Sequence, residues 1–312
     1  MALGALATAC TAASGTTAAT STGSLTPITV AVVPITDAIP YFEAVKNGYF
    51  RQAGLDVTTK ITPQSTAATA DLLRGSVQVI AAANYVNFFA GEARGTLHIK
   101  VLADNSDCGT DTQTVLALPN SGITGPAGLI GKSIAVNINP NIQTLTIDEQ
   151  LKANDIDPSK VHFVTVTFPN MATALKAHRV DAISEVEPFI SQAENALGAV
   201  PVLQQCVGST ADMPLAGFIA NAAWADSHRR TALAFQRAIQ RGEAYASANN
   251  QADEKIMPSF IKIPPSIAAV VNLNIFPSTL NPVKLQRVID LMQRGGMIPA
   301  SRHMSVVPLL FH

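Results

Sequence analysis

Charged residues, aromatic residues and cysteines are all scarce in this sequence, and each shortage removes a class of function. Only 14% of the 312 residues are charged and 5% are aromatic, and the net charge is -1. Such a chain has no basic field to attract nucleic acid or an anionic membrane, and few rings to stack on bases. It also lacks an uninterrupted apolar run of about 18 residues, the length of a membrane-spanning helix. The hydrophobic residues, 47% of the chain, are therefore expected to form a substantial core.

The short motifs of common catalytic and metal-binding sites are missing as well. The sequence contains no G-x-S-x-G elbow, no P-loop, no G-x-G-x-x-G and no H-E-x-x-H. Its six histidines show no ligand-like spacing among themselves or with the three cysteines. No repeat of fixed period appears, which excludes a solenoid. These absences favour a protein that is not an enzyme and that uses no metal or other cofactor.

The first 27 residues differ in composition from the rest of the chain. "MALGALATAC" is a short apolar stretch that ends in small residues and Cys10, and a tract of Ser, Thr, Ala and Gly follows it as a flexible tether. The stretch resembles the end of a bacterial lipoprotein signal, with residues 7–10 as the lipobox. This resemblance implies an exported protein, lipid-anchored through Cys10 on the outer face of the cytoplasmic membrane. The alternative is an incidental Cys10 in an unstructured terminus.

If Cys10 carries lipid, the other two cysteines form an even pair. Cys108 and Cys206 each follow a short apolar strand and a polar turn, in "VLADNSDC" and "VLQQC". An exported protein lies in an oxidising compartment, where such pairs usually close. The sequence therefore predicts a disulfide between Cys108 and Cys206, with two free buried thiols as the alternative.

Strand-like and helix-like segments alternate from residue 28 onward. "ITVAVVP" (28–34) is an unbroken β-branched run, typical of a strand buried on both faces, and "PYFEAVKNGYF" (40–50) has the pattern of a helix. The alternation predicts an α/β fold of mostly parallel sheets flanked by helices. It restarts after residue 112, whereas the chain after residue 224 is helical and lacks strands.

This order predicts two lobes. Residues 28–112 begin lobe 1, residues 113–210 form lobe 2, and residues 211–312 return to lobe 1 with one strand (214–224) and the C-terminal helices. Two short crossings between lobes make a hinge. Residues 1–27 stay outside the fold.

Polar residues gather directly after several predicted strands. In open α/β sheets, ligands bind at the carboxyl ends of the strands, where loops and helix N-termini present unpaired N–H groups. Each such residue could also be a helix cap or a turn former. Agreement between loops favours a shared cleft between the lobes. The residues are Thr36, Asp37, Tyr41, Asn84, Tyr85, Asn87, Asn137, Asn139, Asn141, Gln143, Thr144, Ser184, Glu185, Glu187, Ser209, Thr210 and Asp212.

Four stretches of the chain resemble one family, the bacterial solute-binding proteins of ABC importers for nitrate, sulfonates, taurine and thiamine-pyrimidine precursors. The resemblance implies a type II periplasmic-binding-protein fold, monomeric, that closes over a small solute and delivers it to a membrane permease. The stretches are "DAIPYFEAVKNGYFRQAGLDV" (37–57), "DLLRGSVQVIAAAN" (71–84), "SGITGPAGLIGKSIAVN" (121–137) and "MATALKAHRVDAISEVEPF" (171–189).

The same resemblance implies which residues contact the solute. The family's pocket loops fall on Asp37, Ala38, Tyr41, Asn84, Asn139, Asn141 and Glu187. Secondary candidates are Thr36, Tyr85, Gln143, Thr144 and Asp212.

The two carboxylates among these residues bear on the solute. Oxyanion-binding members use N–H and hydroxyl donors, often with a basic group, whereas these loops carry Asp37 and Glu187 and no Lys or Arg. Like charges in a dehydrated site repel, so a small nitrogenous or zwitterionic solute is favoured. An oxyanion binder in which Asp37 only caps a helix stays open, as does a sensing lipoprotein. An enzyme like the fungal synthases of the thiamine pyrimidine is disfavoured, because it needs an active-site histidine and a cysteine cluster.

Overall fold

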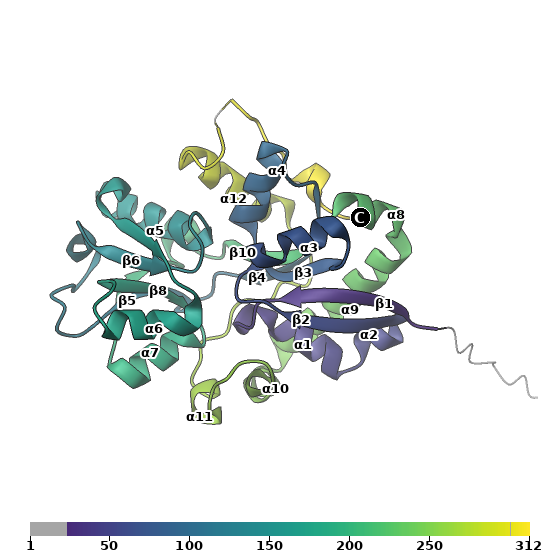
Figure 1. The fold of residues 1–312 in the computed structure, drawn as a ribbon, viewed down its shortest axis with the longest axis horizontal. Coiled ribbons are helices and arrows are strands. Elements are labelled where there is room, and N and C mark those ends of the chain that lie inside the picture. Colours follow the sequence, from purple (N-terminus) through teal and green to yellow (C-terminus); the bar gives the residue numbers. More distant parts are fainter. Residues whose placement is uncertain (1–23, 300) are drawn as a thin grey trace, which may run out of the picture.

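The computed structural model describes residues 24–299 and 301–312, which form two α/β lobes beside each other (Figure 1). Each lobe is built on one five-stranded sheet with helices on both faces. Cys10 and its predicted lipidation lie outside the described residues. None of the described helices is long and apolar enough to cross a membrane.

The sheet of lobe 1 has the strand order β2-β1-β3-β10-β4. β1 pairs in parallel with β2 and β3, while β10 runs antiparallel to both β3 and β4. The apolar strands β1 and β3 are buried through most of their length because helices cover both faces of the sheet. The strands are β1 (Thr26–Val32), β2 (Leu55–Ile61), β3 (Val79–Asn84), β4 (Ile99–Asp107) and β10 (Pro214–Asn221).

Helices from distant parts of the sequence cover lobe 1. The cluster that includes Tyr41, Phe50 and Phe235 packs α1, α2 and α9 on one face, and the cluster that includes Phe88 and Val288 packs α4 and α12 on the other (Figure 1). The helices of the lobe are α1 (Ile39–Lys46), α2 (Tyr49–Gln52), α3 (Thr69–Arg74), α4 (Tyr85–Arg94), α8 (Ala222–Ser227), α9 (Arg229–Ala248), α10 (Asn250–Ile256), α11 (Pro265–Ala268) and α12 (Pro282–Arg294).

Lobe 2 repeats this plan with the strand order β7-β6-β8-β5-β9. β6 pairs in parallel with β7 and β8, and β5 runs antiparallel to β8 and β9. One apolar cluster packs α6 and α7 on one face of the sheet, and a second packs α5 on the other. The elements are β5 (Gln113–Ala117), β6 (Ser133–Val136), α5 (Ile142–Ala153), β7 (His162–Thr165), α6 (Phe168–Lys176), β8 (Ala182–Val186), α7 (Phe189–Leu197) and β9 (Val200–Gln204).

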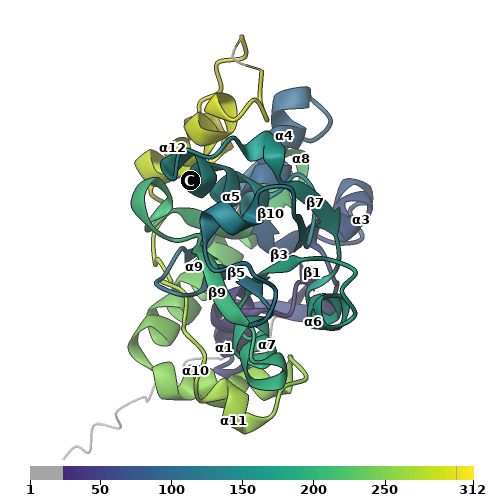
Figure 2. The same cartoon turned by 90° about the vertical axis from the view of Figure 1, so that its left-hand side faces the viewer.

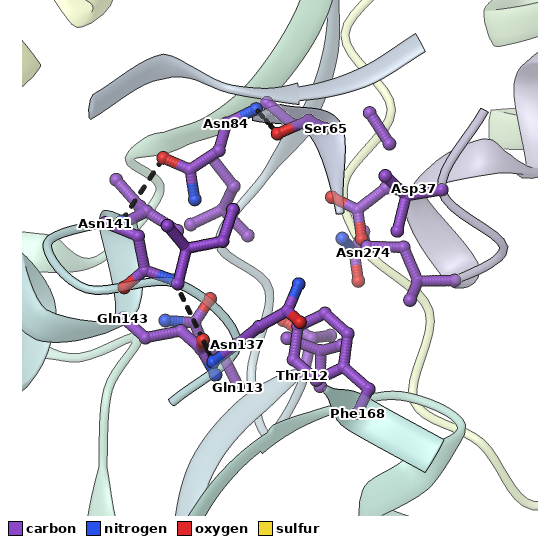
Figure 3. A pocket seen from close by; sticks show the side chains of 18 residues that line it. Asp37, Ser65, Asn84, Thr112, Gln113, Asn137, Asn141, Gln143, Phe168 and Asn274 are labelled. Carbon is purple, nitrogen blue, oxygen red and sulfur yellow. Dashed lines mark hydrogen bonds between the residues drawn. The ribbon is translucent and has the colours of Figure 1, made fainter. Parts of the chain in front are cut away.

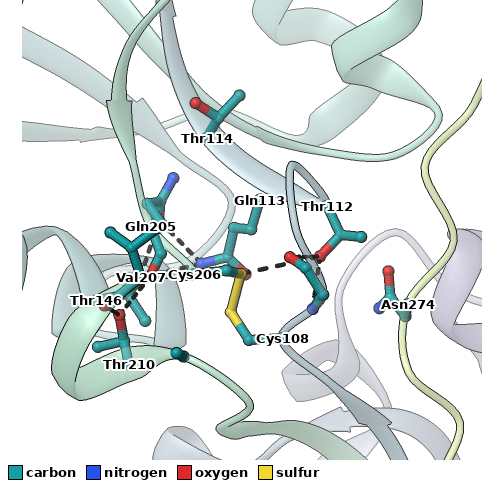
Figure 4. The surroundings of a disulfide bond; sticks show 12 residues. Cys108, Thr112, Gln113, Thr114, Thr146, Gln205, Cys206, Val207, Thr210 and Asn274 are labelled. Carbon is teal, nitrogen blue, oxygen red and sulfur yellow. Dashed lines mark hydrogen bonds between the residues drawn. A yellow bond between two sulfur atoms is a disulfide. The ribbon is translucent and has the colours of Figure 1, made fainter.

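The chain crosses between the sheets twice, after β4 and after β9, and a disulfide joins the two crossings (Figure 4). Cys108 lies one residue beyond β4 and Cys206 two residues beyond β9, with their Cα atoms 5.3 Å apart. The predicted disulfide is therefore confirmed. A lysine adds a second link, because Lys284 Nζ lies 2.7 Å from Asp107 Oδ2 and 2.6 Å from Asp212 Oδ2.

The predicted fold of mostly parallel sheets is confirmed, with one antiparallel strand in each sheet, because β10 and β5 enter from the crossings in the opposite direction. Two local predictions need correction. Residues 105–107, expected to form a polar turn, continue β4, because Ser106 and Asp107 pair with β10. The return strand ends at Asn221, whose side chain caps α8 by accepting from Trp224 N–H.

Candidate functional site

A cavity of about 40 Å³ lies between the lobes and is lined from both of them (Figure 3). One water molecule needs about 10–15 Å³ on this measure, so the cavity holds only a compact group unless the lobes move apart. Its polar lining comprises Asp37, Ser65, Asn84, Thr112, Gln113, Asn137, Asn141, Gln143 and Asn274. Its apolar lining comprises Val33, Ile35, Ala82, Ile138, Ile142, Phe168, Val186, Leu215 and Ala216.

Asp37 is the only ionisable residue among the described residues that line the cavity. It lies in a short 3₁₀ turn, Thr36–Ala38, between β1 and α1, and it is 3% exposed. Ser106 Oγ donates to Asp37 Oδ1, and Asn274 lies beside the carboxylate (Figure 3). Burial raises the pKa of Asp37, and the hydrogen bonds from Ser106 and Asn274 only partly oppose that shift. A ligand cation would favour the ionised carboxylate.

Asn84 connects the two lobes at the opposite wall. It ends β3 and caps α4, because its Oδ1 accepts from Val86 N–H at 3.1 Å. The same oxygen accepts from Ile142 N–H, at the start of α5 in lobe 2, at 3.3 Å. With Oδ1 occupied, the Nδ2 group points into the cavity as a donor (Figure 3). Ser65 supports this position, since its Oγ accepts from Asn84 N–H at 3.4 Å.

The lobe 2 wall is a network of amides organised by Gln143. Gln143 Oε1 accepts from Asn137 N–H at 2.8 Å and from Asn141 Nδ2 at 2.9 Å. Its Nε2 donates to the carbonyl oxygen of Ser184 at 2.6 Å and to Ser184 Oγ at 3.0 Å. Asn141 in turn caps α5 in a capping box with Thr144. Asn137 Oδ1 is buried and has no protein partner, so this side chain keeps hydrogen-bonding capacity for a ligand.

Of the seven primary residues predicted from the resemblance, Asp37, Asn84 and Asn141 line the cavity, and the structure places the other four elsewhere. Ala38 is buried behind Asp37. Tyr41 is buried in the core of lobe 1, because α1 turns its ring away from the cleft, and its hydroxyl lies 2.7 Å from Thr59 Oγ1. Asn139 is exposed. Glu187 is fully buried but bonded to other protein groups.

Among the five secondary residues, only Gln143 lines the cavity. Thr36 donates to the carbonyl oxygen of Glu187, and Thr144 completes the capping box of α5. Tyr85 donates to Asp104 in the core of lobe 1, and Asp212 pairs with Lys284. These four residues are bonded to other protein groups and do not line the cavity.

Sequence reasoning missed four polar lining residues and the apolar ones, of which Phe168 is the largest. Phe168 begins α6 just after β7 and carried the same strand-end signal as the others. Ser65 lies in a 3₁₀ turn beyond β2, Thr112 lies in the first crossing, and Gln113 begins β5. Asn274 comes from the C-terminal region, in a segment without regular structure. No local pattern marks Asn274, because its place is set by long-range packing.

Comparison with known proteins now places the chain. The family model described as "NMT1/THI5 like" matches residues 35–252, which span both lobes. The chain belongs to the NMT1/THI5-like family. This confirms the resemblance drawn from the sequence. A relative from Brachyspira hyodysenteriae, provisionally named an ABC transporter periplasmic binding protein, is 28% identical over 188 residues. That match covers 56% of this chain and 53% of the relative, so the chain spans about half of that protein's length.

Solved structures show the fold of this NMT1/THI5-like protein. The alkanesulfonate-binding protein SsuA from Xanthomonas axonopodis pv. citri is similar with a TM-score of 0.76 at 14% identity, over 92% of this chain and 99% of that one. The periplasmic nitrate-binding protein NrtA from Synechocystis PCC 6803 gives 0.74 at 17% identity, over 89% and 83%. The periplasmic aliphatic sulphonate binding protein SsuA from Escherichia coli gives 0.70 at 14% identity, over 89% and 97%. The protein therefore has the periplasmic-binding-protein fold.

Proposed function

We propose that this protein is the extracytoplasmic solute-binding component of an ABC importer, that it captures its solute between the lobes, and that it has no enzymatic role. The observation that carries the proposal is a cavity lined from both lobes, beside two crossings that can act as a hinge. The names of the relative and of the solved neighbours support it. The permease is the partner that the proposal requires, and lipidation of Cys10 would keep the protein near it.

The solute we propose is a small nitrogenous or zwitterionic molecule. Asp37 provides an acceptor in a dehydrated site, and among the described lining residues Lys, Arg and His are missing. A buried carboxylate gains most from a cationic or multiply donating partner. Asn84 Nδ2 and the Asn137 side chain add neutral hydrogen bonds, while Phe168 and Val186 cover an apolar part of the solute.

An oxyanion is the second candidate, because three of the structural neighbours are named for binding sulfonates or nitrate. Burial raises the pKa of Asp37, and a protonated Asp37 would donate a hydrogen bond to an anion instead of repelling it. The N-terminus of α5 also opens beside the cavity at Asn141 and Ile142.

A thermal-shift panel separates the two candidates. Methylammonium, acetamidinium, 4-aminopyrimidine, glycine, taurine, methanesulfonate and nitrate are added singly to the wild type, to Asp37→Asn and to the exposed control Asp226→Asn. A solute at 100 times its Kd adds about 2.7 kcal/mol to the stability. We expect stabilisation by one or more of the amine, amidine, pyrimidine or amino-acid probes, lost in Asp37→Asn and kept in Asp226→Asn. Stabilisation by sulfonate or nitrate that survives Asp37→Asn would show the oxyanion candidate to be correct.

A further inference from the structure

Glu187 lies at a strand end of lobe 2, as Asp37 does in lobe 1, but its carboxylate is fully committed to protein donors. The residue follows β8 and is 0% exposed. Its Oε2 accepts from Ser191 N–H at 3.2 Å, and its Oε1 accepts from Ser191 Oγ at 2.9 Å. Oε1 also accepts from Asn272 N–H at 3.2 Å. A carboxylate with three such donors has little left to offer a solute.

The backbone of Glu187 makes a second set of contacts on the same side. Its carbonyl oxygen accepts from Thr36 N–H at 3.3 Å and from Thr36 Oγ1 at 3.1 Å. Thr36 immediately precedes Asp37, and Asn272 lies two residues before Asn274. Glu187 thus bonds to the chain neighbours of Asp37 and Asn274. Asp37 and Asn274 lie beside each other at one wall of the cavity (Figure 3).

These bonds cross from one lobe to the other. Glu187 directly follows β8, which pairs with β5 and β6 in the sheet of lobe 2. The segment that carries Asn272 and Asn274 belongs with lobe 1, because Ile275 pairs with Asp107 at the end of β4. The Asp107 N–H donates to the carbonyl oxygen of Ile275 at 2.8 Å, and the Ile275 N–H donates back at 3.3 Å. Separation of the lobes would therefore break the contacts of Glu187 with Thr36 and Asn272.

We propose that Glu187 is a positioning residue that holds the lobes closed and sets the places of Asp37 and Asn274, without contacting the solute. We call this role of Glu187 the latch. The inference rests on the proposed function of solute capture between the lobes. On closure, the Asn272 N–H replaces water as a donor to the Glu187 carboxylate, while Ser191, on α7 of the same lobe, keeps its bonds to Glu187 in either state. Glu187 then governs the ratio of closed to open protein, and Asp37 governs which solute binds. A change in that ratio alters the affinity for every solute by one common factor.

The lobe distance in the absence of any solute tests the latch directly. Spin labels are attached at Arg51→Cys in lobe 1 and Lys176→Cys in lobe 2, both exposed, in a Cys10→Ser background, and the distance distribution is measured by pulsed electron resonance. Glu187→Ala is expected to shift the closed-to-open ratio about tenfold toward the longer distance, the effect of a lost hydrogen bond to a charged group. Glu187→Gln keeps one oxygen that can accept from Asn272 N–H, so a smaller shift in the same direction is expected. The matched control Glu194→Gln, exposed on α7, should leave the distribution unchanged. An unchanged distribution in folded Glu187→Ala would overturn the proposal.

Selectivity gives a second readout. Dissociation constants of methylammonium, acetamidinium and glycine are measured for the wild type, Glu187→Gln and Asp37→Asn. We expect Glu187→Gln to weaken each probe by the same factor and to speed its dissociation, and Asp37→Asn to change the ratios between probes. Altered ratios in Glu187→Gln would mean that Glu187 contacts the solute and would overturn the latch. If none of the probes binds the wild type, the proposed solute class fails, while the distance measurement still decides on the latch.

Discussion

The two lobes are alike in strand order and connectivity, yet they bring different chemistry to the cavity. In lobe 1, the wall holds a carboxylate, Asp37, and the Asn84 Nδ2 group points into the space. In lobe 2, Gln143 makes four hydrogen bonds and Gln113 donates to Thr146 and to Gln205. The groups of lobe 2 are therefore largely satisfied by one another, whereas lobe 1 presents the charge.

This difference indicates that one lobe sets the shape of the cavity and the other sets which solute it prefers. A satisfied amide network is rigid and offers a fixed surface at little reorganisation, which suits one half of a closing site. A buried carboxylate is destabilising until a partner neutralises it, which suits the half that chooses the solute. We infer that lobe 2 provides the shape of the cavity and lobe 1 its preference for charge.

The largest effect is expected from removal of the disulfide that links the two lobes. Cys108 and Cys206 are separated by 98 residues in sequence, so their bond restricts most of lobe 2 in the unfolded chain. Cys108→Ala with Cys206→Ala is expected to lower the free energy of unfolding by about 2–5 kcal/mol. Urea denaturation of the double variant measures this, with the reduced wild type as a control that should unfold at a similar urea concentration. A loss below about 1 kcal/mol would contradict a stabilising role.

A smaller effect is expected from the amide network of lobe 2. Gln143→Leu leaves Asn137 N–H and the Ser184 groups without their partner in a buried site. We expect the free energy of unfolding to fall by about 2–3 kcal/mol, because unsatisfied buried polar groups cost about 1–3 kcal/mol each. Gln52→Leu, at an exposed position of α2, is the control and should change stability by less than about 0.5 kcal/mol. Equal stability of the two variants would show that the network does not make lobe 2 rigid.

The smallest expected effect concerns lobe 1, and it is an increase in the free energy of unfolding rather than a decrease. Because burial raises the pKa of Asp37, the folded state favours the protonated carboxyl, and stability falls as pH rises through that raised pKa. Asp37→Asn is therefore expected to stabilise the solute-free protein by about 0.5–1 kcal/mol at pH 8, with the gain vanishing below pH 4. Tm values from pH 3 to pH 8 measure it, with Asp226→Asn as the control. A loss of stability at pH 8 would mean that the Ser106 and Asn274 contacts outweigh burial.

Much of this organisation could be predicted from the sequence. The alternation of strands and helices predicted two α/β lobes. The even pair formed by Cys108 and Cys206 predicted the disulfide. The strand-end rule found Asp37, Asn84, Asn137, Asn141 and Gln143, because parallel strands end at a common edge whatever packs above them. It could not tell Asp37 from Glu187, since both follow strands and both precede helices.

Contacts between residues far apart in the sequence give Asp37 and Glu187 their different roles. Glu187 is withdrawn from the cavity by Asn272, 85 residues away, and Thr36 meets Asn274 across 238 residues. Local periodicity determines which residues are buried and which follow a strand. By itself it placed Asp37, the acid of "PITDAIP", at the edge of a cleft. The direction of a side chain and the identity of its partner depend on packing between distant segments. Only the tertiary structure therefore decided that Asp37 faces the cavity and that Glu187 joins the lobes.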